Sequence, residues 1–300
     1  MTLAILGCNG QLGRELALSA RIKGLAAAGA DLPEVDITEA ASVRSFIASV
    51  RPSVVVNAAA YTQVDQAESD PQTAFAVNAK GPERLARLCA QRRLPLIHIS
   101  TDYVFDGKGE KPYREDDPVN PLGVYGRSKE EGEQKIRSCW GMHIIIRTAW
   151  LYSPFGQNFV KTMLRLGKER KELRVVADQY GSPTCAADLA RAIVTIIETL
   201  HRNPAPPWGT YHFTGLGITT WHGFAKAVFA EARRYMPLKV MEVIPVPTRE
   251  YPTPALRPGY SVLDCTRIQR LWNATLRPWE ESLKETLHRI FKEPGETDGI

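Results

Sequence analysis

The chain has 300 residues, 44% of them hydrophobic and 24% charged, which excludes a mainly disordered protein and allows a substantial core. Its net charge is +5, from 38 Lys and Arg residues against 33 Asp and Glu residues. The densest basic stretch, 167–174, contains two glutamates, and no basic and aromatic module accompanies it, which argues against nucleic-acid binding. The small positive excess would suit an anionic small molecule.

The five cysteines are far apart, odd in number and without a C-x-x-C pair, and the six histidines form no H-E-x-x-H. This pattern disfavours a disulfide framework and a zinc site, and it indicates no metal ligands. The opening MTLAILG lacks a basic segment, and no apolar run approaches the roughly 18 residues of a membrane span. We therefore expect a cytoplasmic protein without a signal peptide.

The first half of the chain alternates short apolar runs with helix-length amphipathic stretches such as 74–91. The apolar runs lie at 3–6, 25–30 (the weakest), 53–60, 94–101 and 142–150. Because they are continuous rather than alternating, the runs indicate strands that are buried on both faces of a parallel sheet. The pattern predicts an α/β fold with a doubly wound, Rossmann-type parallel sheet.

The glycine-rich sequence GCNGQLG follows the first apolar run directly and opens a helix. Gly7, Gly10 and Gly13 recur there at a spacing of three residues. Glycine permits a tight turn and a close backbone approach, and the N–H groups at a helix start attract a pyrophosphate. These residues predict a dinucleotide-binding loop.

Two further features concern the cofactor. Asp31 and Asp36 both lie at a suitable distance for binding an adenosine ribose, but neither closes the second strand cleanly. Asp36 could equally cap the helix that follows Thr38, so NADH and NADPH both remain possible. Three alanines, 58–60, end the next strand and leave room for a flat group, although they would also suit packing under a helix.

Tyr125 and Lys129 are four residues apart, so a helix would place them on one face. A tyrosine with a pKa near 10 is a slow acid at neutral pH, and a charged lysine nearby favours its phenolate. One ion pair at about 4 Å is worth roughly 4 kcal/mol at an effective dielectric of 20, enough to lower the pKa by about three units. Y-x-x-x-K also occurs by chance on many helices.

Thr101 and Asp102 follow the fourth strand, at the edge where open α/β sheets bind ligands. The Thr101 hydroxyl could hydrogen-bond the substrate oxygen that Tyr125 protonates. The same residues could also serve only as a cap and turn before the loop that follows.

After about residue 150, the alternation of apolar runs with helix-length stretches becomes less regular. This change predicts a smaller C-terminal substrate-binding lobe. A helix is clear at 188–200, and the proline-rich stretch 244–258 is expected to be extended or irregular. The predicted division is a dinucleotide-binding domain at 1–168, a substrate lobe at 169–293 and a frayed tail at 294–300. We expect the helix at 185–201 to pack back on the first domain.

An ordered set of motifs along the chain resembles the dTDP-4-dehydrorhamnose reductase family of the extended short-chain dehydrogenase/reductase group. The motifs are GxxGQLG (7–13), NAAAYTxVDxAE (57–68), VNAxG (77–81), STDYVFDG (100–107), YGxxKxxGE (125–133), RTAWLY (147–152), DQYGSPT (178–184) and RPxYS (257–261). The resemblance covers roughly residues 2–290.

The resemblance implies a role for each matching residue. Tyr125 would donate the proton, Lys129 would hold the nicotinamide ribose and lower the pKa of the tyrosine, and Thr101 would complete the catalytic set. Asp102 and Trp150 would contact the sugar nucleotide together with Thr101 and Tyr125. The expected cofactor-binding residues are Gly7, Gly10, Gln11, Leu12, Gly13, Asp36, Ile37, Ala58, Ala59, Ala60, Tyr125 and Lys129.

The family reduces the C4 ketone of dTDP-6-deoxy-L-lyxo-4-hexulose to dTDP-L-rhamnose with NADPH or NADH. Members can form homodimers, and some bind magnesium at the interface through glutamates, which cannot be placed on this sequence. Neither a nucleic acid nor a membrane is implied as a partner. Trp150 could instead be a core residue, Arg257 could form an ion pair rather than meet a diphosphate, and Asn158 could merely cap a helix.

Two other functions remain open. An epimerase or dehydratase of the same group would reuse Tyr125 and Lys129, but a dehydratase would need Asp-Glu after the threonine, where this chain has Asp102 and Tyr103. A non-catalytic subunit is the other alternative, because the regulatory β subunit of methionine adenosyltransferase resembles the same family. The intact Thr101, Tyr125 and Lys129 favour an enzyme.

Overall fold

The computed structural model describes residues 1–203 and 205–292, so the predicted tail at 294–300 lies outside the described residues. Its centre is a six-stranded sheet with the order β2-β1-β3-β4-β5-β10, in which every neighbouring pair is parallel. The strands are β1 (Thr2–Leu6), β2 (Ala26–Ala30), β3 (Val54–Asn57), β4 (Leu96–Thr101), β5 (His143–Thr148) and β10 (Gly209–His212). The strand order reverses between β1 and β3, so the predicted doubly wound Rossmann-type sheet is confirmed.

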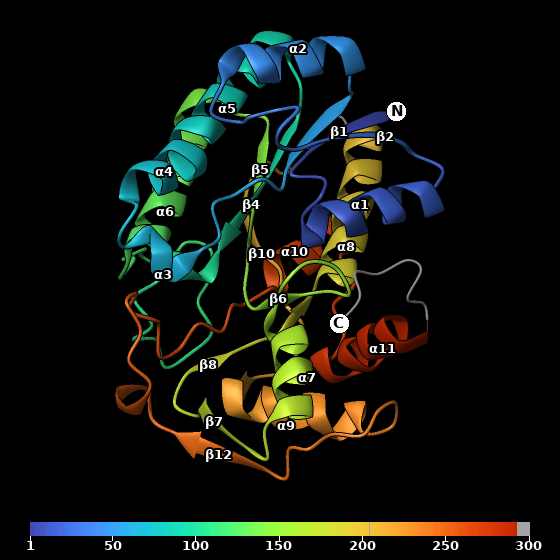
Figure 1. Cartoon of the computed structure of the whole chain (residues 1–300). Helices are drawn as coiled ribbons and strands as arrows, with labels where there is room; N and C mark the ends of the chain where they lie inside the picture. The colour runs from blue at the N-terminus through green and yellow to red at the C-terminus, as the bar shows by residue number, and fades with distance from the viewer. Residues whose placement is uncertain (204, 293–300) are drawn as a thin grey trace.

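Helices cover both faces of this sheet (Figure 1). One face carries α2 (Ala40–Val50), α5 (Gly81–Arg92) and α6 (Val124–Cys139), and the other carries α1 (Gln11–Ile22) and α8 (Ala186–Arg202). Burial on both faces explains the runs of three consecutive apolar residues in β3 (54–56) and β5 (144–146).

The amphipathic stretch 74–91 is not one regular helix. The segment begins with α4 (Pro71–Phe75), continues through a π-helical turn, η1 (Ala76–Lys80), and ends in α5. Asn78 in this turn donates to the Tyr61 carbonyl and to the Ser128 hydroxyl, both at 3.0 Å. The wider π-helical turn therefore directs the polar side chain of Asn78 toward the loop after β3 and toward α6.

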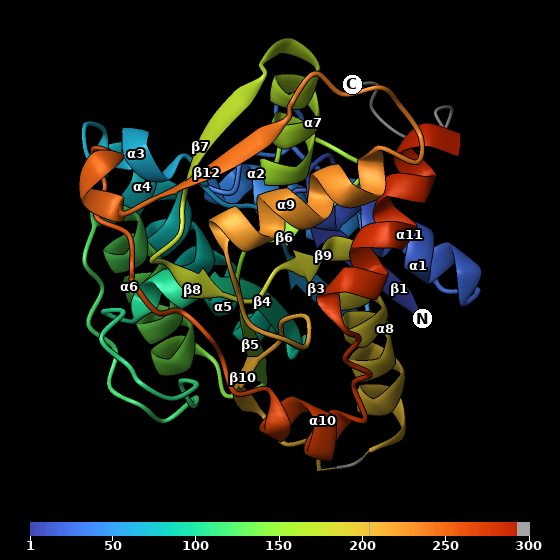
Figure 2. The ribbon, with the colours of Figure 1, turned by 90° about the horizontal axis from the view of Figure 1, so that it is seen from below.

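The C-terminal lobe lies beneath the carboxyl edge of the sheet in Figure 1 and faces the viewer in Figure 2. It contains α7 (Phe159–Glu169), α9 (Trp221–Ala232), α11 (Trp279–Lys292) and a parallel pair, β7 (Glu172–Val176) and β12 (Glu242–Val246). Short elements complete the chain: α3 (Val64–Ala67), η2 (Asp102–Val104), β6 (Leu151–Tyr152), β8 (Tyr180–Gly181), β9 (Thr184–Cys185), β11 (Thr219–Thr220), η3 (Thr248–Glu250) and α10 (Thr266–Trp272).

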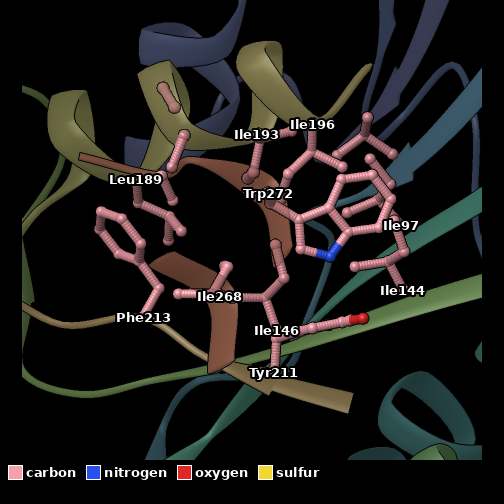
Figure 3. Close-up of a cluster of buried hydrophobic side chains, with 14 of the residues drawn as sticks. Ile97, Ile144, Ile146, Leu189, Ile193, Ile196, Tyr211, Phe213, Ile268 and Trp272 are labelled. Carbon is pink, nitrogen blue, oxygen red and sulfur yellow. The ribbon is translucent and has the colours of Figure 1, made fainter. Parts of the chain in front are cut away.

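The largest hydrophobic cluster joins late parts of the chain to the central sheet (Figure 3). Trp272 of α10 is fully buried, and its ring lies 6.0 Å from that of Tyr211 in β10 in an edge-to-face arrangement. Ile193 and Ile196 of α8 and Ile97 of β4 surround it. The sheet core is therefore completed only when residues beyond 185 fold onto it.

The exact division into lobes stays a prediction. The helix expected at 185–201 corresponds to α8. It packs against α1 and contributes side chains to the core of the sheet. α7, which the predicted division assigns to the first domain, shares a second core cluster with α9 and α11 and is therefore grouped with the C-terminal lobe. Among the described residues, no helix is both long enough and apolar enough to cross a membrane.

Candidate active site

A cleft of about 730 Å³ opens at the carboxyl ends of β1, β3 and β4. It lies where the strand order reverses, which is the position at which open α/β sheets bind ligands. Gly7, Ala58 and Thr101, which follow or end these three strands, all line the cleft. Residues from the second half of the chain, including Trp150 and Asn158, form part of its wall.

The backbone of the glycine loop lies directly against other backbone atoms, both those after β3 and those within the loop itself. Gly7 has a φ of +79°, and a Cβ there would lie 2.6 Å from the Ala59 nitrogen. A Cβ on Gly13 would lie 2.2 Å from the Gly7 carbonyl oxygen. Only glycine fits at these two positions, and Gly13 supports the loop from behind without lining the cleft.

The N-terminus of α1 fits a dinucleotide pyrophosphate. Gly10 occupies the N-cap position, and no side chain caps the first N–H groups of the helix. Gly10, Gln11 and Leu12 line the cleft. Uncapped N–H groups and the helix dipole attract a negatively charged group, so this part of the chain fits the expected cofactor.

Both candidate aspartates line the cleft, but their surroundings differ. Asp31 comes directly after β2, and its carboxylate accepts hydrogen bonds from the backbone N–H groups of Asn9 and Leu32, both at 2.9 Å. Asp36 accepts bonds from the Thr38 N–H at 2.7 Å and the Thr38 hydroxyl at 2.8 Å. The capping role considered for Asp36 is wrong, because α2 begins later with Glu39 as its N-cap.

Thr101, Tyr125 and Lys129 meet in the same cleft. Thr101 is the last residue of β4, while Tyr125 lies in the first turn of α6 and Lys129 one turn later. The Lys129 ammonium donates a hydrogen bond to the Ile99 carbonyl at 2.6 Å, and Lys129 is only 2% exposed. Ala58, Ala59, Ala60 and Ile37 line the cleft as well.

Burial governs the protonation of this pair. It raises the pKa of Tyr125 to about 12. The Thr101 side chain opposes this rise, and the Asp102 charge adds to it. Burial also lowers the pKa of Lys129 to about 8, against the attraction of Glu133. The expected lowering of the tyrosine pKa is therefore wrong for this structure, because desolvation outweighs the other effects.

Asp102 presents an unpaired buried oxygen in the cleft. The residue is 2% exposed, and its Oδ1 accepts a hydrogen bond from the Thr101 hydroxyl at 3.0 Å. Its Oδ2 has no hydrogen-bond partner by distance and angle among the described residues, although the Ser261 side chain lies near enough to lower the pKa of this carboxyl. Burial raises the pKa of this carboxyl to about 6. A buried carboxylate oxygen without a donor is suited to accepting a hydrogen bond from a sugar hydroxyl.

A buried ion pair lies behind Lys129. Glu133, which is fully buried, accepts two bonds from the guanidinium of Arg147, at 2.9 and 2.7 Å. The Ser100 hydroxyl donates to the same carboxylate at 2.5 Å, and Arg137 donates at 2.9 Å. This network ties α6 to β4 and β5 and so fixes the helix that carries Tyr125 and Lys129.

Gly126 shows how closely α6 approaches the backbone that follows β4. A Cβ at this position would lie 2.2 Å from the Tyr103 carbonyl oxygen and 2.9 Å from Pro121 Cβ. The glycine, which weakens a helix by roughly 1 kcal/mol, is thus explained by contact with the backbone after β4. Tyr125 is held beside Thr101 by this contact.

We expect Gly126→Ala to lower the free energy of unfolding by about 1–3 kcal/mol, because the overpacking strain exceeds the gain in helix propensity. Turnover should fall as well, because relief of the clash moves Tyr125. Urea unfolding and initial rates measure both effects. Gly141→Ala is the control, because nothing lies within 4 Å of its added Cβ. Equal stability of the two variants would contradict this explanation.

Trp150 belongs to the wall of the cleft and is not an ordinary core residue. Its φ is +47°, and its ring stacks on that of Trp221 at 3.6 Å with an interplanar angle of 10°. A Cβ on Gly181 would lie 2.5 Å from the indole, so the ring rests on a glycine. Two distant segments, those of Gly181 and Trp221, hold the ring in place, and Trp221 was not identified from the sequence.

A second cleft, of about 720 Å³, adjoins the first through this tryptophan stack, since Trp221 forms part of its lining. Its cationic and aromatic lining residues are Arg170, Arg174, Arg257, Phe159, Trp221 and Tyr251. Arg257 forms an ion pair with Asp65 of α3 at 2.7 Å, so the ion-pair alternative considered for it is confirmed. The pair links the two lobes.

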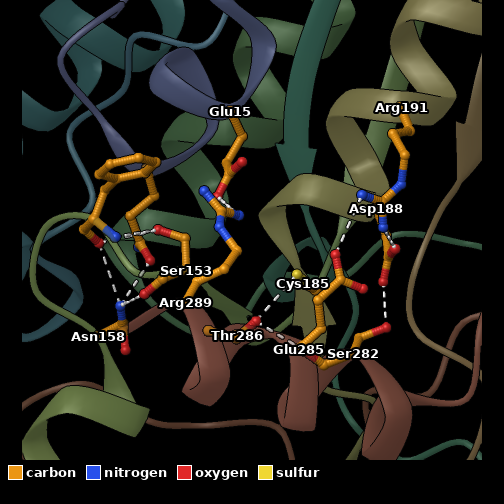
Figure 4. A network of polar contacts seen from close by, with 12 residues as sticks. Glu15, Ser153, Asn158, Cys185, Asp188, Arg191, Ser282, Glu285, Thr286 and Arg289 are labelled. Carbon is orange, nitrogen blue, oxygen red and sulfur yellow. Dashed lines mark hydrogen bonds and ion pairs between the residues drawn. The ribbon is translucent and has the colours of Figure 1, made fainter. Parts of the chain in front are cut away.

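The described residues offer no set of ligands for the expected magnesium. No group of three or more His, Cys, Asp or Glu side chains in this part of the chain could hold a metal ion. Glu15 and Asp188, which lie on α1 and α8, pair with arginines: Glu15 with Arg289 at 2.7 Å, and Asp188 with Arg191 and Arg277. These carboxylates are already neutralised by guanidinium groups (Figure 4).

Comparison with known proteins agrees with this geometry. A family model described as the RmlD substrate binding domain matches residues 1–291. A dTDP-4-dehydrorhamnose reductase from Aggregatibacter actinomycetemcomitans is 43% identical over 290 residues, covering 94% of this chain and 97% of that protein.

Solved structures show the same relationship. A dTDP-4-dehydrorhamnose reductase from Clostridium acetobutylicum superposes with a TM-score of 0.88 at 41% identity, over 96% of this chain and 98% of that one. The enzyme of the same name from Bacillus anthracis, in complex with NADP, has a TM-score of 0.88 at 40% identity, over 95% and 98% of the two chains.

The sheet, the glycine loop and the Thr-Tyr-Lys cleft together define a Rossmann-type oxidoreductase of the extended short-chain dehydrogenase/reductase class. Within that class, the chain belongs to the RmlD substrate binding domain family.

Proposed function

We propose that the protein reduces the C4 ketone of dTDP-6-deoxy-L-lyxo-4-hexulose to dTDP-L-rhamnose with NADPH or NADH. The observation that carries this proposal is the meeting of Thr101, Tyr125 and Lys129 in the cleft that also contains the glycine loop. The reductase name of the full-length relatives supports the reaction, and the NADP bound to the Bacillus anthracis relative supports the cofactor.

The nicotinamide cofactor, when bound, supplies the hydride for the ketone carbon. Tyr125 carries its proton at neutral pH because its pKa lies at about 12. The phenol can therefore donate that proton to the ketone oxygen, and Thr101 supplies a hydrogen bond to the same region. Lys129, beside them in the cleft, stabilises the phenolate that remains after the transfer.

The sugar and nucleotide ends of the substrate have separate sites in this proposal. Asp102 and Trp150 contact the sugar, with the unpaired Asp102 oxygen as the hydrogen-bond acceptor. The second cleft suits a nucleoside diphosphate, because the Arg170 guanidinium in its lining can bind a phosphate and the aromatic rings can stack on a base, while Arg174 and Arg257 pair with Glu250 and Asp65. The tryptophan stack joins the two sites.

The deciding assay supplies dTDP-4-keto-6-deoxyglucose, a 3,5-epimerase and NADPH, and follows loss of NADPH absorbance and formation of dTDP-L-rhamnose. Absence of turnover by the wild-type protein would sink the proposal. Cofactor that copurifies with the protein, without net oxidation of added NADPH, would favour an epimerase instead. Binding of the cofactor without any turnover would favour a regulatory subunit.

Asp31 is placed to select between the two cofactors, because it follows β2 and faces the cleft. A carboxylate there accepts a bond from a ribose 2′-hydroxyl and repels a 2′-phosphate. We expect Asp31→Ser to raise the ratio of kcat/KM for NADPH over NADH by about tenfold or more, which corresponds to roughly 1.4 kcal/mol.

Steady-state kinetics with both cofactors measure this ratio. Glu34→Gln is the matched control, because it removes a carboxylate from the same loop at an exposed position outside the cleft lining. An unchanged ratio in Asp31→Ser, or an equal change in the control, would show that Asp31 does not select the cofactor.

The remaining expectations about assembly are proposals that rest on the family resemblance. A homodimer can be tested by light scattering. The described residues offer no ligand set for magnesium. Reductase assays with and without a chelator test whether the activity depends on this ion. The cytoplasmic location can be tested by cell fractionation.

A further inference from the structure

Residues 153–158, here called the bridging segment, connect the two lobes next to Gln11 of the glycine loop. Its last residue, Asn158, donates from Nδ2 to the Gln11 side-chain oxygen at 3.0 Å and to the Ser153 carbonyl at 2.9 Å. The Oδ1 of Asn158 accepts a bond from the Lys161 N–H at 3.1 Å and so caps α7. Asn158 and Ser153 face each other in Figure 4. One side chain thus contacts the start of α1 and the start of α7.

The bridging segment lies against the first turn of α1. Gly156 has a φ of +62°, and a Cβ there would lie 3.3 Å from the Gln11 Cγ. Gly156, Gln157 and Asn158 line the same cleft as Gln11. The segment is therefore part of the wall at the position proposed for the cofactor pyrophosphate.

Phe155 anchors the bridging segment between two helices. The residue is 5% exposed, and its ring lies 5.3 Å from the Arg14 guanidinium of α1 and 5.7 Å from the Arg289 guanidinium of α11. Arg289 also pairs with Glu15 of α1 at 2.7 Å (Figure 4). A local hydrogen bond also stabilises the backbone of the segment. The hydroxyl of the buried Ser153 accepts it from the Phe155 N–H at 3.0 Å. These contacts make the segment a rigid connector.

The connection continues from Asn158 to the substrate side of the cleft. Phe159 follows directly, and its ring lies 4.7 Å from that of Trp221. Trp221 stacks on Trp150, which lines the cleft. A continuous series of contacts therefore runs from Gln11 through Asn158 and the first turn of α7 to the tryptophan stack between the two clefts.

We infer that Asn158 is a positioning residue that couples cofactor binding at α1 to sugar-nucleotide binding in the C-terminal lobe. The inference rests on the proposed function. A pyrophosphate at the start of α1 would fix Gln11, and the Asn158 amide would then hold α7 and the tryptophan stack in the conformation that binds the second ligand. Such coupling is reciprocal, and it typically changes affinity by about 5–150-fold.

The test measures the affinity of the full-length protein for dTDP by titration calorimetry, with and without saturating NADPH. The wild-type protein is expected to bind dTDP at least about fivefold more tightly when NADPH is present. Asn158→Ser keeps an oxygen that can cap α7 but removes the amide that reaches Gln11. In this variant we expect the ratio of the two affinities to fall close to one, while dTDP binding without cofactor is retained.

Arg165→Gly is the matched control, because it weakens α7 at an exposed position whose ion pair is with Glu169 and not with α1. It should keep the wild-type ratio. An unchanged ratio in Asn158→Ser, or an equal loss in Arg165→Gly, would overturn the inference. Independent binding of dTDP and NADPH by the wild-type protein would overturn the inferred coupling but not the proposed function. Failure of the wild type to bind either ligand would overturn the proposed function as well.

Discussion

Replacing Tyr125 with phenylalanine is expected to lower turnover by about 10³-fold while NADPH still binds. Tyr125 is the group in the cleft that holds a proton beside Thr101, and general acid catalysis typically contributes about 10²–10⁴-fold. The ring, which supports its neighbour Tyr103 edge-to-face at 5.5 Å, is kept in the variant. Initial rates of NADPH oxidation measure the loss, and fluorescence titration measures cofactor binding.

Tyr103→Phe is the matched control for this substitution, since it removes a second phenol that also lines the cleft. We expect it to lower turnover by less than about tenfold, because the resemblance and the position of Thr101 assign the proton transfer to Tyr125. Full turnover by Tyr125→Phe, or equal losses in the two variants, would rule out the assigned acid.

Glu133→Gln is expected to lower the free energy of unfolding by about 3–5 kcal/mol, the range for breaking one partner of a buried ion pair. The substitution leaves the Arg147 guanidinium, 3% exposed, without its counter-charge. The same change frees α6 from β5, so Lys129 and Tyr125 lose their support. Urea unfolding followed by circular dichroism measures the stability, and turnover should fall with it.

The control for this prediction is Glu169→Gln on α7. Glu169 pairs with Arg165 at 3.4 Å, but the two side chains are 54% and 59% exposed. Exposed pairs contribute about 0–1 kcal/mol, so the control should remain close to wild type. A similar small effect of Glu133→Gln would show that the buried pair does not hold α6.

The same network determines how the free energy of unfolding depends on pH. Burial alone would raise the pKa of Glu133, but the Arg147 charge and the hydrogen bonds from Arg147, Ser100 and Arg137 lower it below the ordinary value of 4.5. Because the folded-state pKa is lowered, this stabilisation is present above pH 4.5 and is lost as the pH falls through the folded-state value.

Much of the fold follows from short-range patterns. The apolar runs located five strands of the sheet. The inner strands β1, β3, β4 and β5 are buried on both faces, which favours continuous apolar runs, whereas β2 is an edge strand with three of its five residues exposed. The weakest run, at 25–30, was still β2. The missed strand, β10 (Gly209–His212), lies at the sheet edge and is half-exposed at its first two residues, so its apolar signal is weak. The interruption at Ala76–Lys80 was hidden because a π-helical turn keeps an amphipathic pattern.

By itself, the sequence predicted which residues carry the chemistry, namely Thr101, Tyr125 and Lys129, with a glycine loop after the first strand, and the structure brings all of them to one cleft. It did so because strand ends and helix spacing are local properties. Only the tertiary structure decided their electrostatics. Burial of the pair raises the tyrosine pKa and lowers the lysine pKa, and burial depends on every segment packed around the cleft.

Long-range contacts decided the substrate side of the cleft in the same way. Trp150 stacks on Trp221, which is distant in the sequence, and Asn158 reaches back to Gln11. Neither contact leaves a periodic signal, because each joins segments that meet only when the C-terminal lobe folds against the sheet. The position of Asp31 in the cleft likewise became clear only once β2 was seen to end at Ala30.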